Sequence, residues 1–227
     1  MPYPHLYSLQ HCPYAMRARL GLLLAEQAIN VRAVNLKNKP PEMLLASPKG
    51  TVPVLVQIAE RDGNEVEAVI DESLDIMLWG LTRHDPHNVL HADKPHSLAK
   101  NLALIERNDQ EFIALLKKYK HASRYRDFAQ LYYRSQCEVF IAELESSLQR
   151  QDFLLGSTPS LADYALLPFI RQFARVDRKW YLQAPYPRLR DWLNRHLQQP
   201  LFTKAMIKYP LWLDNHEAFL LGSPAPA

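Results

Sequence analysis

The fold is decided by the stretch Leu6-Tyr-Ser-Leu-Gln-His-Cys-Pro-Tyr14, which runs directly into Ala15-Met-Arg-Ala-Arg-Leu-Gly-Leu-Leu-Leu-Ala25. The first part predicts a short apolar strand that ends in a polar turn, and the second part predicts a helix. Pro13 suits the first turn of that helix, because the amide that proline lacks would have no partner there. Cys12 is therefore expected at a helix N-terminus, where free amides and the helix dipole favour a negative charge.

A cysteine in this position has the chemistry of a nucleophile. A free thiol with an ordinary pKa of about 8.5 is only a few per cent ionised at pH 7, whereas a thiol with a pKa of about 5 is almost fully thiolate. Arg17 and Arg19, on the same predicted helix, add positive charge. The alternative is a buried structural cysteine, and the strand, Cys-Pro-aromatic turn and helix around Cys12 favour the reactive thiolate.

The composition is that of an ordinary soluble globular chain. The 227 residues have a net charge of +3, which is too small and too evenly mixed to predict nucleic-acid binding. No apolar run approaches the roughly 20 residues that span a bilayer, and the N-terminus has no secretory pattern. Two cysteines, Cys12 and Cys137, cannot form a disulfide framework. We therefore expect a cytoplasmic protein, in a reducing compartment, with no nucleic-acid or membrane partner.

The first eighty residues alternate between strand and helix patterns. The expected order is the strand from Leu6, the helix after Cys12, a strand over 31–36, a short helix over 42–46, strands over 52–58 and 66–70, and a helix over 72–81. Asp62-Gly63 predicts the turn between the last two strands, which should be antiparallel. The first two strands flank a helix and should be parallel. This order predicts a four-stranded mixed sheet with helices on its faces.

These elements match a thioredoxin-like domain, and the residues resemble glutathione transferases, above all the omega class and the glutaredoxin-2-like group. The resemblance is carried by Tyr7-Ser-Leu-Gln-His-Cys-Pro-Tyr14, Asn35-Leu-Lys-Asn-Lys-Pro40, Thr51-Val-Pro-Val-Leu55 and the acidic-Ser pair Glu72-Ser73. Each stretch is weak alone, but all four in this order are a strong signal. The implied fold class is α/β plus all-α, with a thioredoxin-like domain followed by an all-helical domain.

The change of pattern along the chain gives the domain boundaries. Residues 1–82 form the expected glutathione-binding domain, and the polar residues 83–96 form a linker. Apolar residues recur at helical spacing over 97–221, which predicts an all-α domain, and the Pro-rich residues 222–227 are expected to be a disordered tail. No metal site is expected, because the histidines in the linker lack a fixed ligand spacing; they are His84, His87, His91 and His96.

The resemblance makes glutathione the co-substrate and gives each motif a role. Thr51-Val52-Pro53 matches the family's cis-proline turn, in which Val52 would offer its N–H and C=O to the cysteinyl part of glutathione. Glu72 would pair with the γ-glutamyl ammonium, and Ser73 would hold the carboxylate at a helix start. Lys39 matches the basic residue for the glycine carboxylate. The implied glutathione-binding residues are Cys12, Tyr14, Lys39, Val52, Pro53, Glu72 and Ser73.

From the residues alone, each of these motifs has a plainer interpretation. Pro53 could be a trans proline that opens an edge strand. Glu72 and Ser73 could be an ordinary helix cap, and Lys39 could simply be solvated in a polar loop.

Cys12 is the expected catalytic residue. It would attack a disulfide sulfur to form a mixed disulfide, which glutathione then resolves. Ala15 stands where dithiol glutaredoxins have a second cysteine, so only monothiol chemistry is open, and Cys137 is expected to be part of the core. The resemblance implies glutathione-dependent thiol transfer, deglutathionylation or dehydroascorbate-type reduction by a homodimeric enzyme.

Two other functions stay open. Tyr7 and Ser8 lie near the end of the first strand and could activate glutathione through a hydroxyl, in which case the enzyme conjugates electrophiles. The chain could also be a non-catalytic glutathione-binding or interaction module, because fold alone does not fix function.

The helical half contributes two further expectations. Ser160 and Asp163 are spaced as a capping box, with Asp in place of the usual Glu or Gln, and the resemblance gives Asp163 a structural role as a buried acid. The second substrate, a small thiol, disulfide or electrophile, is expected over Cys12 between the domains. Its apolar wall is expected to include Tyr14, Tyr125, Trp180 and Trp212.

Overall fold

The structure is a computed structural model that describes residues 3–58, 66–94 and 96–222. Two sequence-based expectations fall outside these ranges: the Asp62-Gly63 turn and residues 223–227 of the expected tail. None of the helices in the described ranges combines the length and the hydropathy that crossing a membrane requires.

The chain divides into two compact units. The first unit joins Met1–His87 to Gln199–Ala227, and the second unit is Asn88–Gln198. This division differs from the expected all-α domain over 97–221, because the last stretch of that range returns to the N-terminal unit. The expected linker over 83–96 is shared between the two units.

The first unit is built on a mixed sheet with strand order β4-β3-β1-β2-β5. The parallel pair β1 and β2 and the antiparallel pairs β1–β3 and β3–β4 confirm the predicted directions. The strands are β1 (His5–Ser8), β2 (Asn30–Ala33), β3 (Val54–Ile58), β4 (Val66–Ile70) and β5 (Phe219–Leu220).

Two details of the sheet correct the sequence analysis. The second strand ends at Ala33 rather than at residue 36, because Asn35 turns the chain and its carbonyl accepts a hydrogen bond from the Asn38 amide at 3.0 Å. The sheet also has five strands instead of four. The fifth strand, β5, pairs antiparallel with β2, with Phe219 opposite Val31.

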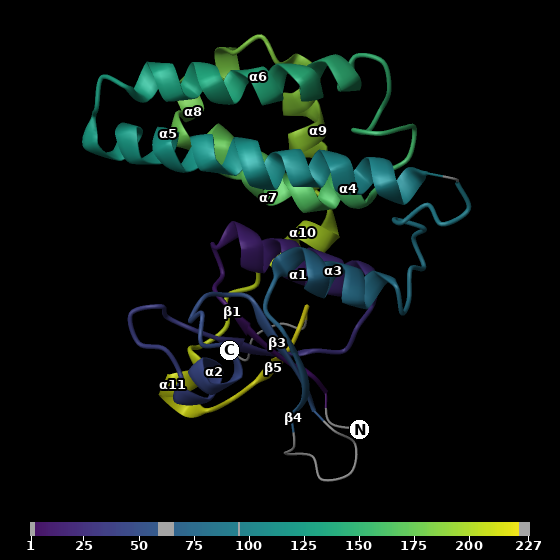
Figure 1. Cartoon of the computed structure of the whole chain (residues 1–227), viewed down its shortest axis with the longest axis vertical. Helices are drawn as coiled ribbons and strands as arrows, with labels where there is room; N and C mark the ends of the chain where they lie inside the picture. Colours follow the sequence, from purple (N-terminus) through teal and green to yellow (C-terminus); the bar gives the residue numbers. More distant parts are fainter. Residues whose placement is uncertain (1–2, 59–65, 95, 223–227) are drawn as a thin grey trace. The chain divides into compact units, whose positions relative to one another are not determined.

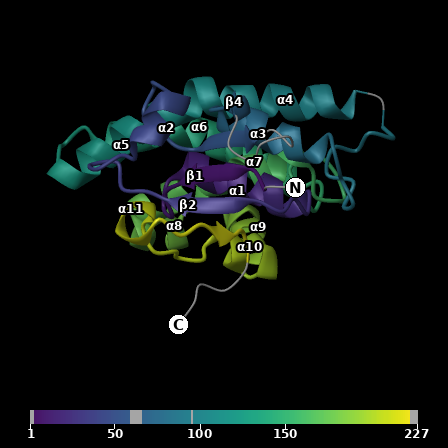
Figure 2. The same cartoon turned by 90° about the horizontal axis from the view of Figure 1, so that it is seen from below.

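The segment that contains β5 also contains α10 (Pro200–Ala205) and α11 (Trp212–Asn215). Figure 2 shows this segment, in yellow, beside β2. Its apolar residues do not belong to the helical unit, because they pack on the sheet's own buried cluster around Leu6 and Ile29. The residues that make this contact include Ile207, Tyr209, Phe219 and Leu221.

Helices cover both faces of this sheet (Figure 1). One face, which contains Leu6, packs under α1 (Pro13–Leu24) and α3 (Ser73–Leu81). The other face, which contains Tyr7, packs under α2 (Pro41–Ala46). The alternation of side chains along β1 places these two neighbours in different cores.

The second unit is helical, as expected. Its central helix is α7 (Leu161–Val176), in which every residue from 161 to 170 is buried. Phe112 packs against this helix, and its ring centre lies 5.9 Å from that of Phe173. Cys137 is fully buried here and burial raises the pKa of its thiol to about 12, which confirms its expected place in the core. The helices are α4 (Ser97–Arg107), the π-helical turn η1 (Asn108–Phe112), α5 (Ile113–Tyr125), α6 (Gln130–Leu148), α7 (Leu161–Val176), α8 (Arg178–Gln183) and α9 (Pro187–Leu197).

Candidate active site

Cys12 lies at the N-terminus of α1, where the sequence predicts it. It is the N-cap residue, with extended backbone angles (φ −72°, ψ 123°), and Pro13 is the first helical residue. The Cys12 amide donates to the Leu9 carbonyl at 3.2 Å, and the Cys12 carbonyl accepts from the Met16 amide at 2.9 Å. Cys12 is half-buried, unlike the fully buried Cys137.

The cis-proline turn faces this sulfur. The Val52–Pro53 peptide bond is cis, which confirms that prediction. Cys12 Sγ lies 3.9 Å from the Val52 carbonyl oxygen and donates toward it. The fold therefore joins two motifs that are 40 residues apart in the sequence.

Lys39 lies close to the same turn. A Cβ atom added to Gly50 would stand only 2.9 Å from Lys39 Nζ, and Gly50 has a φ of +59° that favours glycine. The lysine amine is thus held against the backbone two residues before Val52. The structure therefore places a basic group close to the cis-proline turn.

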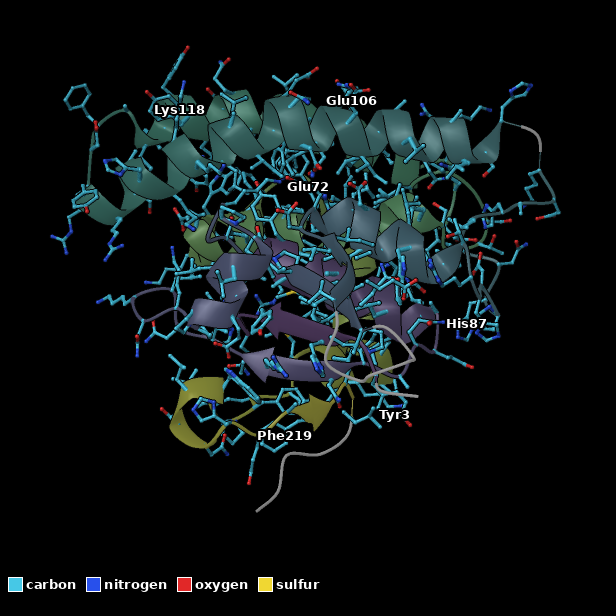
Figure 3. All side chains as sticks on the ribbon, turned by 60° about the horizontal axis from the view of Figure 1, so that its bottom comes forward. Tyr3, Glu72, His87, Glu106, Lys118 and Phe219 are labelled. Atoms are coloured by element: carbon cyan, nitrogen blue, oxygen red, sulfur yellow. The ribbon has the colours of Figure 1, made fainter. Side chains whose placement is uncertain are left out.

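Glu72 and Ser73 lie at the N-terminus of α3, with Glu72 as the N-cap residue and Ser73 buried. The carboxylate of Glu72, labelled in Figure 3, lies 2.7 Å from Lys49 Nζ. Lys49 also lies 2.9 Å from Asp71 Oδ1, and Ser47 Oγ donates to Asp71 Oδ2 at 2.7 Å. Lys49 could not be predicted from the sequence, because it lies outside every recognised motif and contacts Glu72 only in the folded chain.

The two hydroxyl groups that could replace Cys12 are already engaged. Ser8 is buried, and its Oγ accepts a hydrogen bond from Arg19 Nη1. The Tyr7 hydroxyl accepts from Arg32 Nη1 at 2.7 Å, and burial raises the pKa of Tyr7. Tyr7 and Ser8 are each 2% exposed, whereas Cys12 is half-buried.

Two of the expected substrate-wall aromatics belong to the first unit. Tyr14 is the second residue of α1, two positions after Cys12, and is half-buried. Trp212 is held more firmly: its indole N–H donates to Glu42, and the Arg32 guanidinium lies 4.0 Å from its ring centre. These contacts give Trp212 a structural role in joining the C-terminal segment to α2 and β2.

The other two aromatics belong to the second unit. Tyr125 ends α5 and is 65% exposed. Trp180 packs edge-on against Phe173 at 5.9 Å, under the Arg134 guanidinium at 4.2 Å. Their part in binding a second substrate stays a prediction.

Asp163 has the buried, structural place that the sequence predicts. It forms a capping box with Ser160, whose amide donates to Asp163 Oδ2 at 2.9 Å and whose hydroxyl donates at 3.0 Å. Its other oxygen accepts from the Leu154 amide at 3.0 Å and from the Trp192 indole at 2.8 Å. Burial raises the pKa of Asp163, and these hydrogen bonds act in the opposite direction.

The described residues contain no group of three or more His, Cys, Asp or Glu side chains that could hold a metal ion. Two of the linker histidines instead make single contacts. The His84 ring lies 3.2 Å from the Ala25 carbonyl, and the His91 ring lies 3.2 Å from Thr158 Oγ1.

Comparison with known proteins gives the same family for both units. The family model of the glutathione S-transferase N-terminal domain matches residues 6–88, and the C-terminal domain model matches residues 129–195. The chain is 27% identical over 220 residues to glutathione S-transferase omega-1 of Mus musculus, covering 96% of this chain and 87% of that protein. It is 28% identical over 200 residues to pyrimidodiazepine synthase of Drosophila melanogaster, covering 86% and 77%.

Solved structures support the same fold. A glutathione transferase from Pseudomonas putida, with one glutathione disulfide bound per subunit, superposes with a TM-score of 0.77 over 90% of this chain and 91% of that chain. The sequence identity is 15%, so this structural similarity is evidence for the fold alone.

Proposed function

The chain belongs to the glutathione S-transferase family and is a glutathione transferase, and we propose that Cys12 is its nucleophile in glutathione-dependent thiol transfer. The single observation that carries this proposal is the position of the Cys12 sulfur. Cys12 is the half-buried N-cap residue of α1, and its sulfur lies 3.9 Å from the carbonyl oxygen of the residue before the cis proline. A thiolate there benefits from the first-turn amides and the helix dipole.

The proposed reaction exchanges one disulfide for another. The Cys12 thiolate attacks the glutathionyl sulfur of a mixed disulfide between glutathione and a small thiol, so that a new S–S bond forms and the old one breaks. The small thiol leaves as a thiolate and takes a proton from water. A second glutathione, as thiolate, attacks the glutathionyl sulfur on Cys12, releasing glutathione disulfide and restoring the Cys12 thiolate.

The surrounding residues support glutathione binding in the orientation that the motifs imply. The Val52 backbone would pair with the cysteinyl part of glutathione, beside the Cys12 sulfur, with Tyr14 near by. The buried start of α3 at Ser73 offers first-turn amides to the γ-glutamyl carboxylate. The Lys39 amine would pair with the glycine carboxylate. The ammonium group would compete with Lys49 for the Glu72 carboxylate.

The chain has one cysteine suited to this chemistry. Both cysteines are free, but Cys137 is fully buried, and Ala15 occupies the position of a resolving thiol. We therefore propose a monothiol mechanism, of which deglutathionylation is one case. Dehydroascorbate-type reduction would use the same thiol, with two glutathione molecules supplying the two electrons and ending as glutathione disulfide. The proposal includes a homodimeric state, which light scattering would test. It also places the protein in a reducing cytoplasm, which cell fractionation would test.

Intact mass spectrometry after incubation with oxidised glutathione tests the proposal. Wild type and Cys137→Ser should each gain one glutathionyl group, and Cys12→Ser should gain none. An unmodified wild type would favour the non-catalytic binding module. Turnover of an aryl halide that survives Cys12→Ser would favour hydroxyl-assisted conjugation instead.

A further inference from the structure

The turn that leads into Cys12, residues 8–12, is held by the side chain of Arg19. Arg19 lies two helical turns along α1 and is 2% exposed. Its Nη2 donates to the Gln10 carbonyl at 2.7 Å, and its Nη1 donates to the Leu9 carbonyl at 3.2 Å and to Ser8 Oγ. One guanidinium therefore binds three consecutive residues of the turn.

The same guanidinium reaches the C-terminal segment of residues 199–221, here called the C-terminal strap. Arg19 Nε donates to the Ala205 carbonyl at 2.7 Å. Next to it, Gln10 Nε2 donates to the Met206 carbonyl at 2.8 Å. Two adjacent carbonyls at the end of α10 are thus bonded to Arg19 and to the turn itself.

The C-terminal strap is fixed to the sheet on the far side of these bonds. The Leu221 amide donates to the Ile29 carbonyl at 2.8 Å, so the end of the strap is tied to the residue before β2. Tyr209 stacks on Phe219 with ring centres 5.4 Å apart. Figure 3 labels Phe219 on the yellow strand at the edge of the sheet. The strap is therefore a fixed support rather than a loose end.

Packing alone does not hold the turn against the strap. A cavity of about 170 Å³ separates the turn, β2 and the strap. Leu9, His11, Ile207, Tyr209 and Leu211 are among its lining residues. Across this cavity, the hydrogen bonds from Arg19 and Gln10 join the turn to the strap.

In the part of the chain that the structure describes, Arg19 donates to no carboxylate. Every acceptor that the described residues give it is a neutral carbonyl or hydroxyl oxygen. Burial lowers the pKa of Arg19 to about 10, so it stays a cation at neutral pH, and a negative charge on Cys12 acts against that lowering. This attraction is mutual, since a buried cation stabilises an anion near it.

We propose that Arg19 is the positioning residue for Cys12, and that the C-terminal strap is the support through which it acts. Arg19 sets the backbone of the turn, and thereby the direction of the sulfur, and its charge favours the thiolate. This inference rests on the proposed function, because it concerns the reactivity of the same thiol. It adds that residues 205 and 206, nearly two hundred positions away, take part in setting that reactivity.

The test measures alkylation of Cys12 by iodoacetamide as a function of pH, in a Cys137→Ser background, by intact mass. Three variants test the separate parts of the proposal. Arg19→Met removes both the positive charge and the hydrogen bonds of the guanidinium. Arg19→Lys keeps the charge but cannot make the several hydrogen bonds of the planar guanidinium. Gln10→Ala removes only the side-chain hydrogen bond to the Met206 carbonyl. Arg83→Met, a surface arginine in the same unit, is the matched control. Thermal unfolding fixes a temperature at which each variant is folded.

We expect Arg19→Met to move the alkylation profile to higher pH by about one unit, which lowers the rate at pH 6.5 about tenfold. Arg19→Lys should leave the midpoint pH of the alkylation profile unchanged and lower the plateau alkylation rate a few-fold. Gln10→Ala should lower the plateau and leave the midpoint in place, and Arg83→Met should match the parent.

A folded Arg19→Met protein with the parent profile overturns the proposal. If Arg19→Met does not fold, Arg19→Lys and Gln10→Ala decide, and unchanged plateau rates in both overturn it. Failure of the proposed function gives a different result: the parent protein itself reacts as slowly as a free cysteine, whatever the variants do.

Discussion

The amine of Lys49 lies 2.7 Å from the carboxylate of Glu72, the group that we expect to bind the ammonium of glutathione. Both side chains are largely exposed, so water and salt weaken the pair. If Glu72 binds that ammonium as proposed, glutathione and Lys49 would compete for one carboxylate at the start of α3. An exposed pair of this kind contributes little to stability, which limits how much affinity the competition can cost.

Removing Lys49 should therefore strengthen glutathione binding slightly. For Lys49→Gln we expect the KM for glutathione to fall by up to about fivefold, with kcat unchanged. Steady-state kinetics at low ionic strength measures the effect, which should shrink as salt is added. Lys37 is an exposed lysine in the loop before α2, so Lys37→Gln is the control and should leave the KM for glutathione unchanged. A several-fold rise in KM for Lys49→Gln would mean that Lys49 itself binds the ligand.

Asp163 should matter for stability far more than for chemistry. Its two oxygens accept four hydrogen bonds inside a fully buried site, so Asp163→Ala leaves several donors without a partner. We expect a loss of about 3–5 kcal/mol in the free energy of unfolding, measured by urea titration. Ser160→Ala removes one hydroxyl of the capping box and should cost only about 1 kcal/mol. Equal losses for the two variants would show that the network does not centre on the carboxylate.

His196 should make the protein sensitive to acid. It is buried among the rings of Trp192 at 4.9 Å, Tyr164 at 5.3 Å and Phe153 at 6.0 Å. Neither ring nitrogen has a hydrogen-bond partner among the described residues, and burial lowers the pKa of His196 to about 4.

The sign of this effect follows from proton binding. Below pH 6.5 the unfolded chain protonates His196 and the folded chain does not, so stability is complete above pH 6.5 and falls as the pH drops toward 4. The loss is about 3 kcal/mol by pH 4. His196→Phe should match wild type at pH 7.5 and be more stable by about that amount at pH 4, in paired urea titrations. If the free energy of unfolding fell equally with decreasing pH in wild type and His196→Phe, His196 would not be the source of the acid sensitivity.

Local patterns explain which parts of the fold could be predicted. Cys12 and Pro13 define a helix start within two residues, and Ser160 and Asp163 define another within four, so neighbouring residues carry the information. The first two strands and the cis Val52–Pro53 turn also follow from local pattern and family resemblance.

The missed features depend on contacts between distant parts of the chain. The strand β5 is two residues long, and its pairing with Asn30 and Val31 of β2 is what makes it a strand. The Lys49–Glu72 pair and the Trp192–Asp163 bond join residues 23 and 29 positions apart, and no motif marks Lys49 or Trp192 as the partner. The apolar residues of the C-terminal strap fit a helical pattern equally well, so their return to the sheet could not be predicted.

The central claim is that the Cys12 sulfur takes the glutathionyl group during turnover. The most direct measurement mixes the enzyme with one equivalent of a glutathione mixed disulfide, without free glutathione, and follows the released thiol and the mass of the Cys12 peptide together. We predict one equivalent of thiol released and one glutathionyl group on Cys12, removed again when glutathione is added. Release of the thiol with Cys12 unmodified, or equal release by Cys12→Ser, would contradict the account.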